Sequence, residues 1–367
     1  MKITGVEVYE LQIPFTRGVE KESPSSFLKA DAIDFCLVKI ETDVGITGWG
    51  DAFSFYCRRS VAEAIKHMIK PYLIGKNPLD VQKINFELQK TLHTFGRYGI
   101  TMFAISAVDI ALWDIVSKFN NLPLYNILGS SGNKKMPAYA SLWRYEDAEC
   151  VQDRCKHAIN LGYKYIKLHE VFTSEVKAAR EVVGEDIPIM VDTNCSWTKD
   201  QAEQMLNEWK DFNLYWVEEP INPPEDFASL SNLKTKIFTP IAAGENACTS
   251  YEFIKMFEAE AVDYAQPSVT KVGGVTEFIK VLSVAKTYGV QVMPHSPYFG
   301  PGFLATLHLA QSMPNPGLLE RFFIDFEAYL YPEDLFKPKD GFFIVPDKPG
   351  LGLDPDKNVI KDYLVKS

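Results

Sequence analysis

The chain has 367 residues, of which 46% are hydrophobic and 23% are charged, a balance typical of a globular protein that buries a large core. Its 48 acidic and 38 basic side chains give a net charge of −10 at pH 7, and no basic stripe is present, so we expect no nucleic-acid partner. The start has no signal-peptide pattern and the chain has no uninterrupted apolar run of about 20 residues, which predicts a cytoplasmic protein without a membrane partner.

Residues 1–130 are predicted to form a small α+β domain. Short alternating segments indicate strands, and apolar residues at helical spacing follow them. The predicted elements are strands at 3–13 and 34–40, a glycine-containing hairpin at 43–50 that returns to a third strand, and helices at 61–74, 79–93 and 100–119. Pro123, Gly129 and Gly132 are turn signals that end the domain.

Beyond residue 131 the pattern changes to short apolar runs with amphipathic helical stretches between most of them. The runs cover 136–142, 163–169, 188–194, 214–220, 240–246, 261–267, 290–296 and 316–322. Eight strands separated by helices are what a (β/α) barrel requires, and an open doubly wound sheet is the competing architecture. Polar residues close nearly every run, at the strand ends where barrel active sites lie. We therefore expect a barrel over 131–325 and a tail over 326–367 that packs back on the first domain.

Three successive runs end in carboxylates. Asp192 closes the third run, Glu218 and Glu219 close the fourth, and Glu245 closes the fifth. Like charges at one rim are costly unless a cation compensates them, so the pattern predicts a metal site. Oxygen ligands without a histidine on these strands favour Mg²⁺, with Mn²⁺ as the alternative ion. Glu218 and Glu219 point to opposite sides of a strand, and spacing leaves open which of them faces the lumen.

Basic groups close two other runs. Lys167 and His169 alternate at the end of the second run, so both can face the lumen, and His295 closes the seventh run on a different wall. A metal held by carboxylates at a barrel mouth suits the enolate that forms when a carbon acid loses its proton. Histidine transfers protons near neutral pH, so the two histidines are candidates for the acid and base of this chemistry.

These residues resemble the enolase superfamily, and within it the mandelate racemase subgroup of the mandelate racemase/muconate lactonizing enzyme family. The resemblance covers essentially the whole chain and rests on the motifs DIALWD at 109–114, WVEEP at 216–220, GEN at 244–246, KVGG at 271–274 and LLE at 318–320. It implies an α/β fold, a modified (β/α)7β barrel with an N-terminal α+β capping domain that the C-terminal tail completes. Family members commonly form homo-oligomers, from dimers to octamers, and we expect one here.

The resemblance also implies roles for single residues. The metal ligands that it implies are Asp192, Glu218 and Glu245. Lys167 matches a lysine near the substrate carboxylate, and His169 takes the place of the second lysine of a KxK pair, which is a base. His295 matches the strand-seven histidine of racemase-like members, and Glu320 matches the acid that hydrogen-bonds the substrate carboxylate or enolate.

Two departures from the family pattern bear on the reaction. The lysine pair is KxH here, and Ser268 stands where racemase-like members carry the aspartate that pairs with the strand-seven histidine. Without that aspartate, His295 suits a general acid that protonates a departing hydroxyl, with His169 as the base. This division favours elimination over racemisation, and the reverse assignment of the two histidines stays open.

Substrate identity would be read by loops 16–28 and 52–59 of the capping domain, which in this family close over the barrel mouth. The residues that we expect to contact substrate there and at the strand ends are Arg17, Tyr56, Trp143, Arg144, Asn194, Ser268 and Tyr298.

The leading hypothesis is an acid-sugar dehydratase, a carbon–oxygen lyase that removes the α-proton of a sugar acid and then β-eliminates water. The alternative is an isomerase of the same family, either a cycloisomerase that opens an anhydro-sugar acid or lactone ring, or an epimerase or racemase. A non-catalytic metal-binding paralogue is the remote alternative. Each catalytic hypothesis takes a small carboxylate as substrate.

Overall fold

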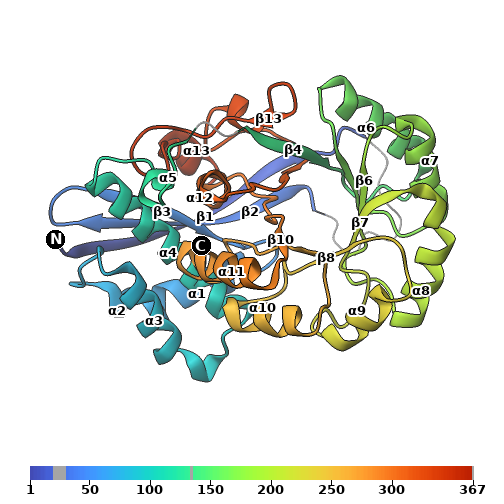
Figure 1. The fold of residues 1–367 in the computed structure, drawn as a ribbon. Coiled ribbons are helices and arrows are strands. Elements are labelled where there is room, and N and C mark those ends of the chain that lie inside the picture. Colours follow the sequence, from blue (N-terminus) through green and yellow to red (C-terminus); the bar gives the residue numbers. More distant parts are fainter. Residues whose placement is uncertain (20–29, 133–134, 366–367) are drawn as a thin grey trace.

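Two sheets organise the chain in a computed structural model that describes residues 1–19, 30–132 and 135–365. Figure 1 shows β1 to β3 of the antiparallel sheet, in blue, on one side and the curled parallel sheet, which begins in green at β4 (Met136–Ser141), on the other. The antiparallel sheet has the order β12–β1–β2–β3, formed by Asp325–Phe326, Ile3–Thr16, Ala32–Thr42 and Thr47–Ala52. Its first three strands in the chain are those that the sequence predicts.

Helices of the N-terminal part pack against this sheet. They are α1 (Arg58–Ala64), a π-helical turn (Ile65–Ile69), α2 (Lys70–Leu73), α3 (Val81–Thr91), a 3-10 turn (His93–Phe95), α4 (Gly99–Phe119) and α5 (Leu124–Ile127). Of the glycines in the predicted hairpin, only Gly45 lies in the turn, with φ of 80°. Gly48 and Gly50 lie in β3. Glycine is needed at position 50 because a Cβ atom there would overlap the Ala107 carbonyl oxygen of α4.

The parallel sheet contains eight strands in the order β10–β9–β8–β7–β6–β5–β4–β11. In chain order these are β4 (Met136–Ser141), β5 (Ile166–Leu168), β6 (Ile189–Asp192), β7 (Leu214–Glu218), β8 (Ile241–Ala243), β9 (Tyr264–Ala265), β10 (Gln291–Val292) and β11 (Leu319–Phe322). The helices between them are α6 (Ala148–Asn160), α7 (Thr173–Val183), α8 (Lys199–Glu208), α9 (Phe227–Lys234), α10 (Thr249–Glu258), α11 (Gly274–Tyr288) and α12 (Pro301–Ser312). Seven helices between eight parallel strands confirm the predicted (β/α)7β fold class.

The barrel closes between β10 and β11 through side chains. In the described part of the chain no backbone ladder joins these two strands. Instead the Leu318 N–H donates to Met293 Sδ at 3.2 Å, and the Ser296 N–H donates to Glu320 Oε2 at 3.2 Å. The second of these bonds fixes Glu320 at the mouth of the barrel, beside the seventh strand.

A separate apolar cluster fills the barrel interior. It consists of Tyr139, Met190, Trp216, Ala242, Met293 and Leu318. Because these side chains are buried, the barrel has a packed interior and not a pore, and polar strand-end residues lie above this floor.

The motif at 109–114 joins the N-terminal part to the rest of the chain. Asp109 of α4 accepts the Thr276 N–H of α11 at 2.9 Å, and Asp114 accepts the Leu351 N–H of the tail at 2.9 Å. The tail also returns through β12, which pairs with β1, and through β13 (Phe342–Phe343), which pairs with β4. A 3-10 turn (Glu333–Phe336) lies between β12 and β13, and α13 (Lys357–Asp362) follows β13. The predicted domain limits at 130/131 and 325/326 stay predictions.

Among the described residues, α4 alone is long and apolar enough to cross a membrane by length and composition. Of its most apolar window, 78% is buried within the structure. It packs on β3 and α11. Its apolar character is therefore that of a core helix.

Candidate active site

The polar residues predicted to form a site gather at the carboxyl ends of the barrel strands. The strands are shorter than the apolar runs because the chain turns away as each run ends. Asn194, Cys195 and Glu219 have positive φ values of 47°, 56° and 43° and stop β6 and β7. Non-glycine residues adopt this conformation only at a cost, and such strain is concentrated at functional sites.

Three carboxylates form a cluster. One carboxylate oxygen each of Asp192, Glu218 and Glu245 lies within 4.8 Å of the others. Glu219, which spacing alone could not separate from Glu218, points away from this cluster. It accepts hydrogen bonds from Asn246 Nδ2 at 2.8 Å and from Cys195 Sγ at 3.4 Å.

Two buried lysines only partly compensate these acids. Lys167 Nζ lies 3.2 Å from Asp192 Oδ2, 2.9 Å from Glu218 Oε1 and 3.0 Å from Glu320 Oε1. Lys271 Nζ lies 2.9 Å from Glu245 Oε1. If all four acids were ionised and both histidines neutral, the two ammonium groups would leave two negative charges, which a divalent cation would balance.

The protonation of the cluster reflects this imbalance. At Asp192 burial favours the neutral acid, but Lys167 and His169 outweigh it and lower the pKa below its usual range. At Glu218 burial dominates and raises the pKa well above its usual range, although Lys167 opposes the rise. The acids therefore do not all ionise without further positive charge. Hard oxygen ligands in a cluster of this kind fit a cation such as Mg²⁺.

His169 stands at the end of β5 with one nitrogen fixed and the other facing the acids. Its Nδ1 lies 2.5 Å from the Leu142 carbonyl oxygen, and because a carbonyl only accepts, Nδ1 carries a hydrogen. Its Nε2 lies 3.4 Å from Asp192 Oδ2. Arg144 Nε donates to the His169 carbonyl at 2.5 Å and holds this segment in place. When the ring is neutral, with its hydrogen on Nδ1, Nε2 is the atom able to accept a proton; in the protonated ring the same Nε2 donates to Asp192 Oδ2.

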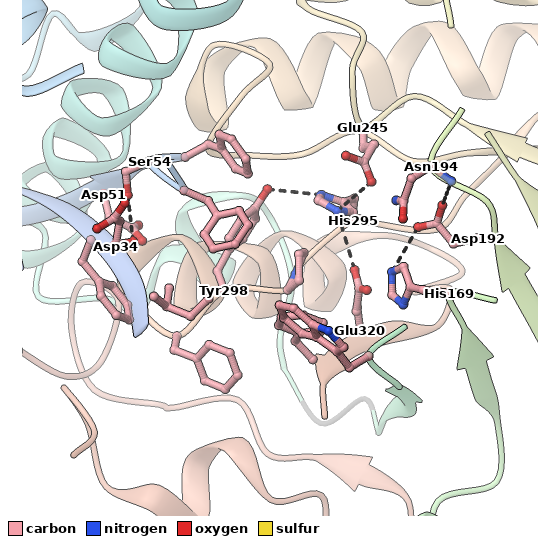
Figure 2. Close-up of a pocket in the computed structure, with 18 of the residues that line it drawn as sticks. Asp34, Asp51, Ser54, His169, Asp192, Asn194, Glu245, His295, Tyr298 and Glu320 are labelled. Carbon is pink, nitrogen blue, oxygen red and sulfur yellow. Dashed lines mark hydrogen bonds and ion pairs between the residues drawn. The ribbon is translucent and has the colours of Figure 1, made fainter. Parts of the chain in front are cut away.

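His295 reaches the same acids from the β10 side. Its Nε2 lies 2.9 Å from Glu245 Oε2 and 4.0 Å from Glu320 Oε2. A carboxylate accepts hydrogen bonds and cannot donate, so Nε2 carries the hydrogen here. Its Nδ1 lies 3.2 Å from the Tyr298 hydroxyl. Figure 2 shows the two histidines on either side of Glu320, each directed toward a carboxylate of the cluster.

Glu320 is fully buried and remains charged. Burial alone would raise its pKa, but Lys167 and His295 outweigh burial, so the pKa lies below its usual value. The carboxylate therefore serves as a fixed negative group that holds the Lys167 ammonium and the Ser296 N–H.

These groups open into one cavity of about 600 Å³. His169, Asp192, Glu245, His295 and Glu320 line its catalytic end, and the far end reaches β2 and β3 of the capping domain. Figure 2 shows Asp34, Asp51 and Ser54 at that far end, with Tyr298 between them and the histidines. A volume in this range suits a small organic ligand.

Four of the predicted substrate-contact residues line this cavity. They are Trp143, Arg144, Asn194 and Tyr298. Arg144 Nη2 donates to Asn194 Oδ1 at 3.2 Å, and the Asn194 N–H donates to Asp192 Oδ1 at 2.8 Å, so the two residues are tied to the acidic cluster.

The other three, Arg17, Tyr56 and Ser268, are not among the described residues that line it. Arg17 stacks on Trp143, with its guanidinium carbon 4.5 Å from the ring centroid. Tyr56 is 54% exposed, and Ser268 lies behind Tyr298 and is hydrogen-bonded to it. Residues 20–28 of the predicted lid loop lie outside the described residues.

Several lining or supporting residues were not singled out from the sequence. Lys271 belongs to the KVGG motif, but nothing in its spacing connects it to Glu245. Phe322 lines the cavity two residues after Glu320, so period-2 alternation along β11 could have found it. Asp51 lines the cavity from β3, which no pattern in the barrel half predicts, whereas Phe53 belongs to the predicted loop 52–59, whose residues 52–55 line the cavity.

Comparison with known proteins agrees with this architecture. Residues 21–129 match the model for the mandelate racemase/muconate lactonizing enzyme N-terminal domain, and residues 151–359 match the model described as enolase C-terminal domain-like. The chain is similar to an arabinonate dehydratase of Saccharolobus solfataricus, with 32% identity over 95% of this chain and 96% of the relative. It is similar to a D-xylonate dehydratase of Haloferax volcanii, with 27% identity over 100% of this chain and 94% of the relative.

A solved structure covers the whole fold. The 3,6-anhydro-D-galactonate cycloisomerase of Zobellia galactanivorans matches with a TM-score of 0.85 and 28% identity, over 100% of both chains. Together with the two matched domains, this likeness supports the resemblance drawn from the sequence motifs. The chain belongs to the mandelate racemase/muconate lactonizing enzyme family of the enolase superfamily.

Proposed function

We propose that this protein is an acid-sugar dehydratase, which removes the proton α to the carboxylate of a sugar acid and then expels the β-hydroxyl as water. The observation that carries the proposal is the pair of histidines from different walls whose Nε2 atoms face one acidic cluster, at 3.4 Å and 2.9 Å from its carboxylates. An elimination needs a base at one carbon and an acid at the next, and two imidazoles provide both. Curated relatives that act as arabinonate and D-xylonate dehydratases support the same reaction class.

Asp192, Glu218 and Glu245 are the proposed ligands of Mg²⁺, with Mn²⁺ as the alternative ion. When bound, the ion neutralises the negative charge that develops on the substrate carboxylate as the α-proton leaves. Lys167 adds a fixed positive charge next to the proposed metal ligands Asp192 and Glu218. Glu320, in its protonated form, is proposed to hydrogen-bond the substrate carboxylate or enolate, because an ionised carboxylate only accepts; while ionised, it holds the Lys167 ammonium.

His169 is the proposed base. Leu142 holds the Nδ1 hydrogen, so the Nε2 lone pair takes the α-proton. His295 is the proposed acid, and its Nε2 proton goes to the leaving hydroxyl as the carbon–oxygen bond breaks. The electrons left at the α-carbon form the carbon–carbon double bond of an enol, which becomes the 2-keto-3-deoxy acid.

The test is incubation with a library of pentonates and hexonates in D₂O with Mg²⁺, followed by mass spectrometry. The matched variants are His169→Asn and His295→Asn. We expect His169→Asn to lower the rates of both α-proton exchange and dehydration by at least ~10²-fold. We expect His295→Asn to lower the rate of dehydration and to retain α-proton exchange. Chelation of the metal from wild type should stop both.

Other outcomes select other functions. Exchange or rearrangement by wild type without loss of water would refute the dehydratase and favour an isomerase. If wild type changes none of the acids in the presence of Mg²⁺ or Mn²⁺, the result would favour the non-catalytic metal-binding paralogue.

A cycloisomerase is the second candidate because one wall of the cavity is aromatic. Trp143 and Phe322 pack with centroids 5.4 Å apart, and Phe322 lies 6.3 Å from the His169 ring. Aromatic faces pack well against the C–H face of a sugar ring and leave hydroxyls of an extended chain unpaired. The cycloisomerase relative is consistent with this reading. An anhydro-hexonate in the same library tests it, since ring opening loses no water and in D₂O leaves a carbon-bound deuterium in the product.

We also propose a cytoplasmic location and a homo-oligomeric state between dimer and octamer, as family members commonly have. Size-exclusion chromatography with light scattering measures the second, and a monomer at micromolar concentration would contradict it.

A further inference from the structure

The hydrogen-bond partner of His295 Nδ1 is a phenol and not a carboxylate, whereas Nε2 faces the Glu245 carboxylate. Tyr298 follows β10 three residues after His295, and its hydroxyl lies 3.2 Å from Nδ1. On its other side the same hydroxyl is hydrogen-bonded to Ser268 Oγ. Ser268 has no exposed surface and is not among the described residues that line the cavity. It is therefore placed to hold Tyr298 and not to touch a substrate.

The direction of these bonds follows from what each atom can donate. As the proposed general acid, His295 gives away a hydrogen from Nε2, the ring nitrogen opposite the one that contacts Tyr298. A general acid must keep a hydrogen on its other nitrogen after the transfer, or the ring would become an anion. The Tyr298 oxygen can accept that Nδ1–H bond, and Ser268 Oγ can accept the hydrogen of Tyr298.

We infer that Tyr298, held by Ser268, is the positioning residue of His295. It accepts the Nδ1–H bond, turns the ring so that Nε2 points into the cavity, and does so without placing an anion behind the imidazole. When Nε2 gives its proton to the leaving hydroxyl, the carbon–oxygen bond breaks, water departs, and a neutral ring remains with its Nδ1 hydrogen on the Tyr298 oxygen. This inference rests on the proposed dehydratase function, because it assigns a support to the acid of that reaction.

The inference distinguishes the two half-reactions. Exchange of the α-proton needs the base His169, which lies on another wall and is held by Leu142. Water loss needs His295 as well. A residue that only positions His295 should therefore change the ratio of exchange to water loss, whereas a residue that binds substrate should slow both equally.

The experiment measures both rates for Tyr298→Phe, Ser268→Ala and Ser268→Thr in D₂O with Mg²⁺, on an acid that wild type dehydrates. Partners that orient a functional imidazole commonly contribute about 10- to 100-fold. We expect Tyr298→Phe to slow water loss at least ~10-fold with little change in exchange or KM. Ser268→Ala should shift the ratio in the same direction by less, and Ser268→Thr, which keeps the hydroxyl, should restore it.

Tyr251→Phe is the matched control, because Tyr251 lies on α10, is 64% exposed and does not line the cavity. The ratio of α-proton exchange to water loss in Tyr251→Phe should equal that of wild type. Equal slowing of exchange and water loss by Tyr298→Phe, or an effect on KM alone, would overturn the inference and leave the dehydratase standing. If Tyr298→Phe does not fold, an unchanged ratio in Ser268→Ala overturns it. If wild type shows neither exchange nor water loss on any acid, the proposed function fails first and the inference falls with it.

Discussion

Replacing Lys167 by methionine should destabilise the metal-free protein and at the same time strengthen its hold on a divalent cation. The Lys167 side chain is 1% exposed and contacts three carboxylates at 2.9 to 3.2 Å. Methionine has a similar length and fills the same space, so the main change is the loss of one positive charge.

The magnitude follows from the burial of the charges. Removing one partner of a buried ion pair costs about 3–5 kcal/mol, because the remaining charge is left without compensation. At about 2 °C per kcal/mol for a chain of this size, the Tm without metal should fall by about 6–10 °C. The same loss removes a repulsion between the ammonium and an incoming cation. If affinity for Mg²⁺ rises about tenfold, saturating Mg²⁺ adds about 1.4 kcal/mol more stability to the variant than to wild type.

Thermal unfolding at pH 7.5, with chelator and with excess Mg²⁺, measures both effects. The control is Lys271→Met, which removes a buried lysine that contacts one carboxylate, Glu245 at 2.9 Å, and should show smaller changes in both. A Lys167→Met variant that melts at the wild-type temperature without metal, or gains no more from Mg²⁺ than wild type does, would refute the charge argument.

Three further changes test other parts of the structure. Burial raises the pKa of Asp51 to about 7, so the folded chain holds this proton more tightly than the unfolded chain. The protonated Asp51 side chain therefore contributes its full stability below about pH 4, and this contribution is lost as the pH rises to about 7. Asp51→Asn should remove that loss, so its Tm relative to wild type should rise between pH 5 and 8, and a constant difference would contradict the assignment. Arg144→Met removes the donor to the His169 carbonyl and should lower exchange and water loss together by about 10²-fold in the D₂O assay, with the ratio unchanged. Gly50→Ala would overlap a backbone carbonyl of α4 and should cost about 3 kcal/mol in denaturant unfolding, whereas Gly75→Ala, which meets no atom within 4 Å, should cost about 1 kcal/mol.

The order of elements could be predicted because each depends on neighbours in the sequence. Eight apolar runs with helices between them gave the barrel, and all eight strands form within the predicted ranges. The strand boundaries were too long, since residues such as Asn194 and Glu219 continue the pattern of a strand while their positive φ values end it. Backbone reversals of this kind are set by contacts with adjacent strand ends, and hydrophobic pattern does not report them.

The residues of the acidic cluster could be predicted only in part from the spacing of the sequence. Asp192 and Glu245 follow from their place at strand ends. Glu218 could not be separated from Glu219 by spacing, because adjacent residues differ only in the side of the strand they face. The contacts decide it: Glu218 meets Lys167, and Glu219 meets Asn246 outside the cluster.

The sequence by itself determined the kind of fold and the chemical groups at the barrel mouth, because both depend on short-range periodicity and residue type. Only the tertiary structure decided how those groups support one another. Arg17 lies against Trp143, and Tyr298 contacts both its near neighbour His295 and Ser268, which lies 30 residues away in the chain. The direction of a loop side chain is set by which surfaces pack beside it after folding, and residues distant in the chain supply those surfaces.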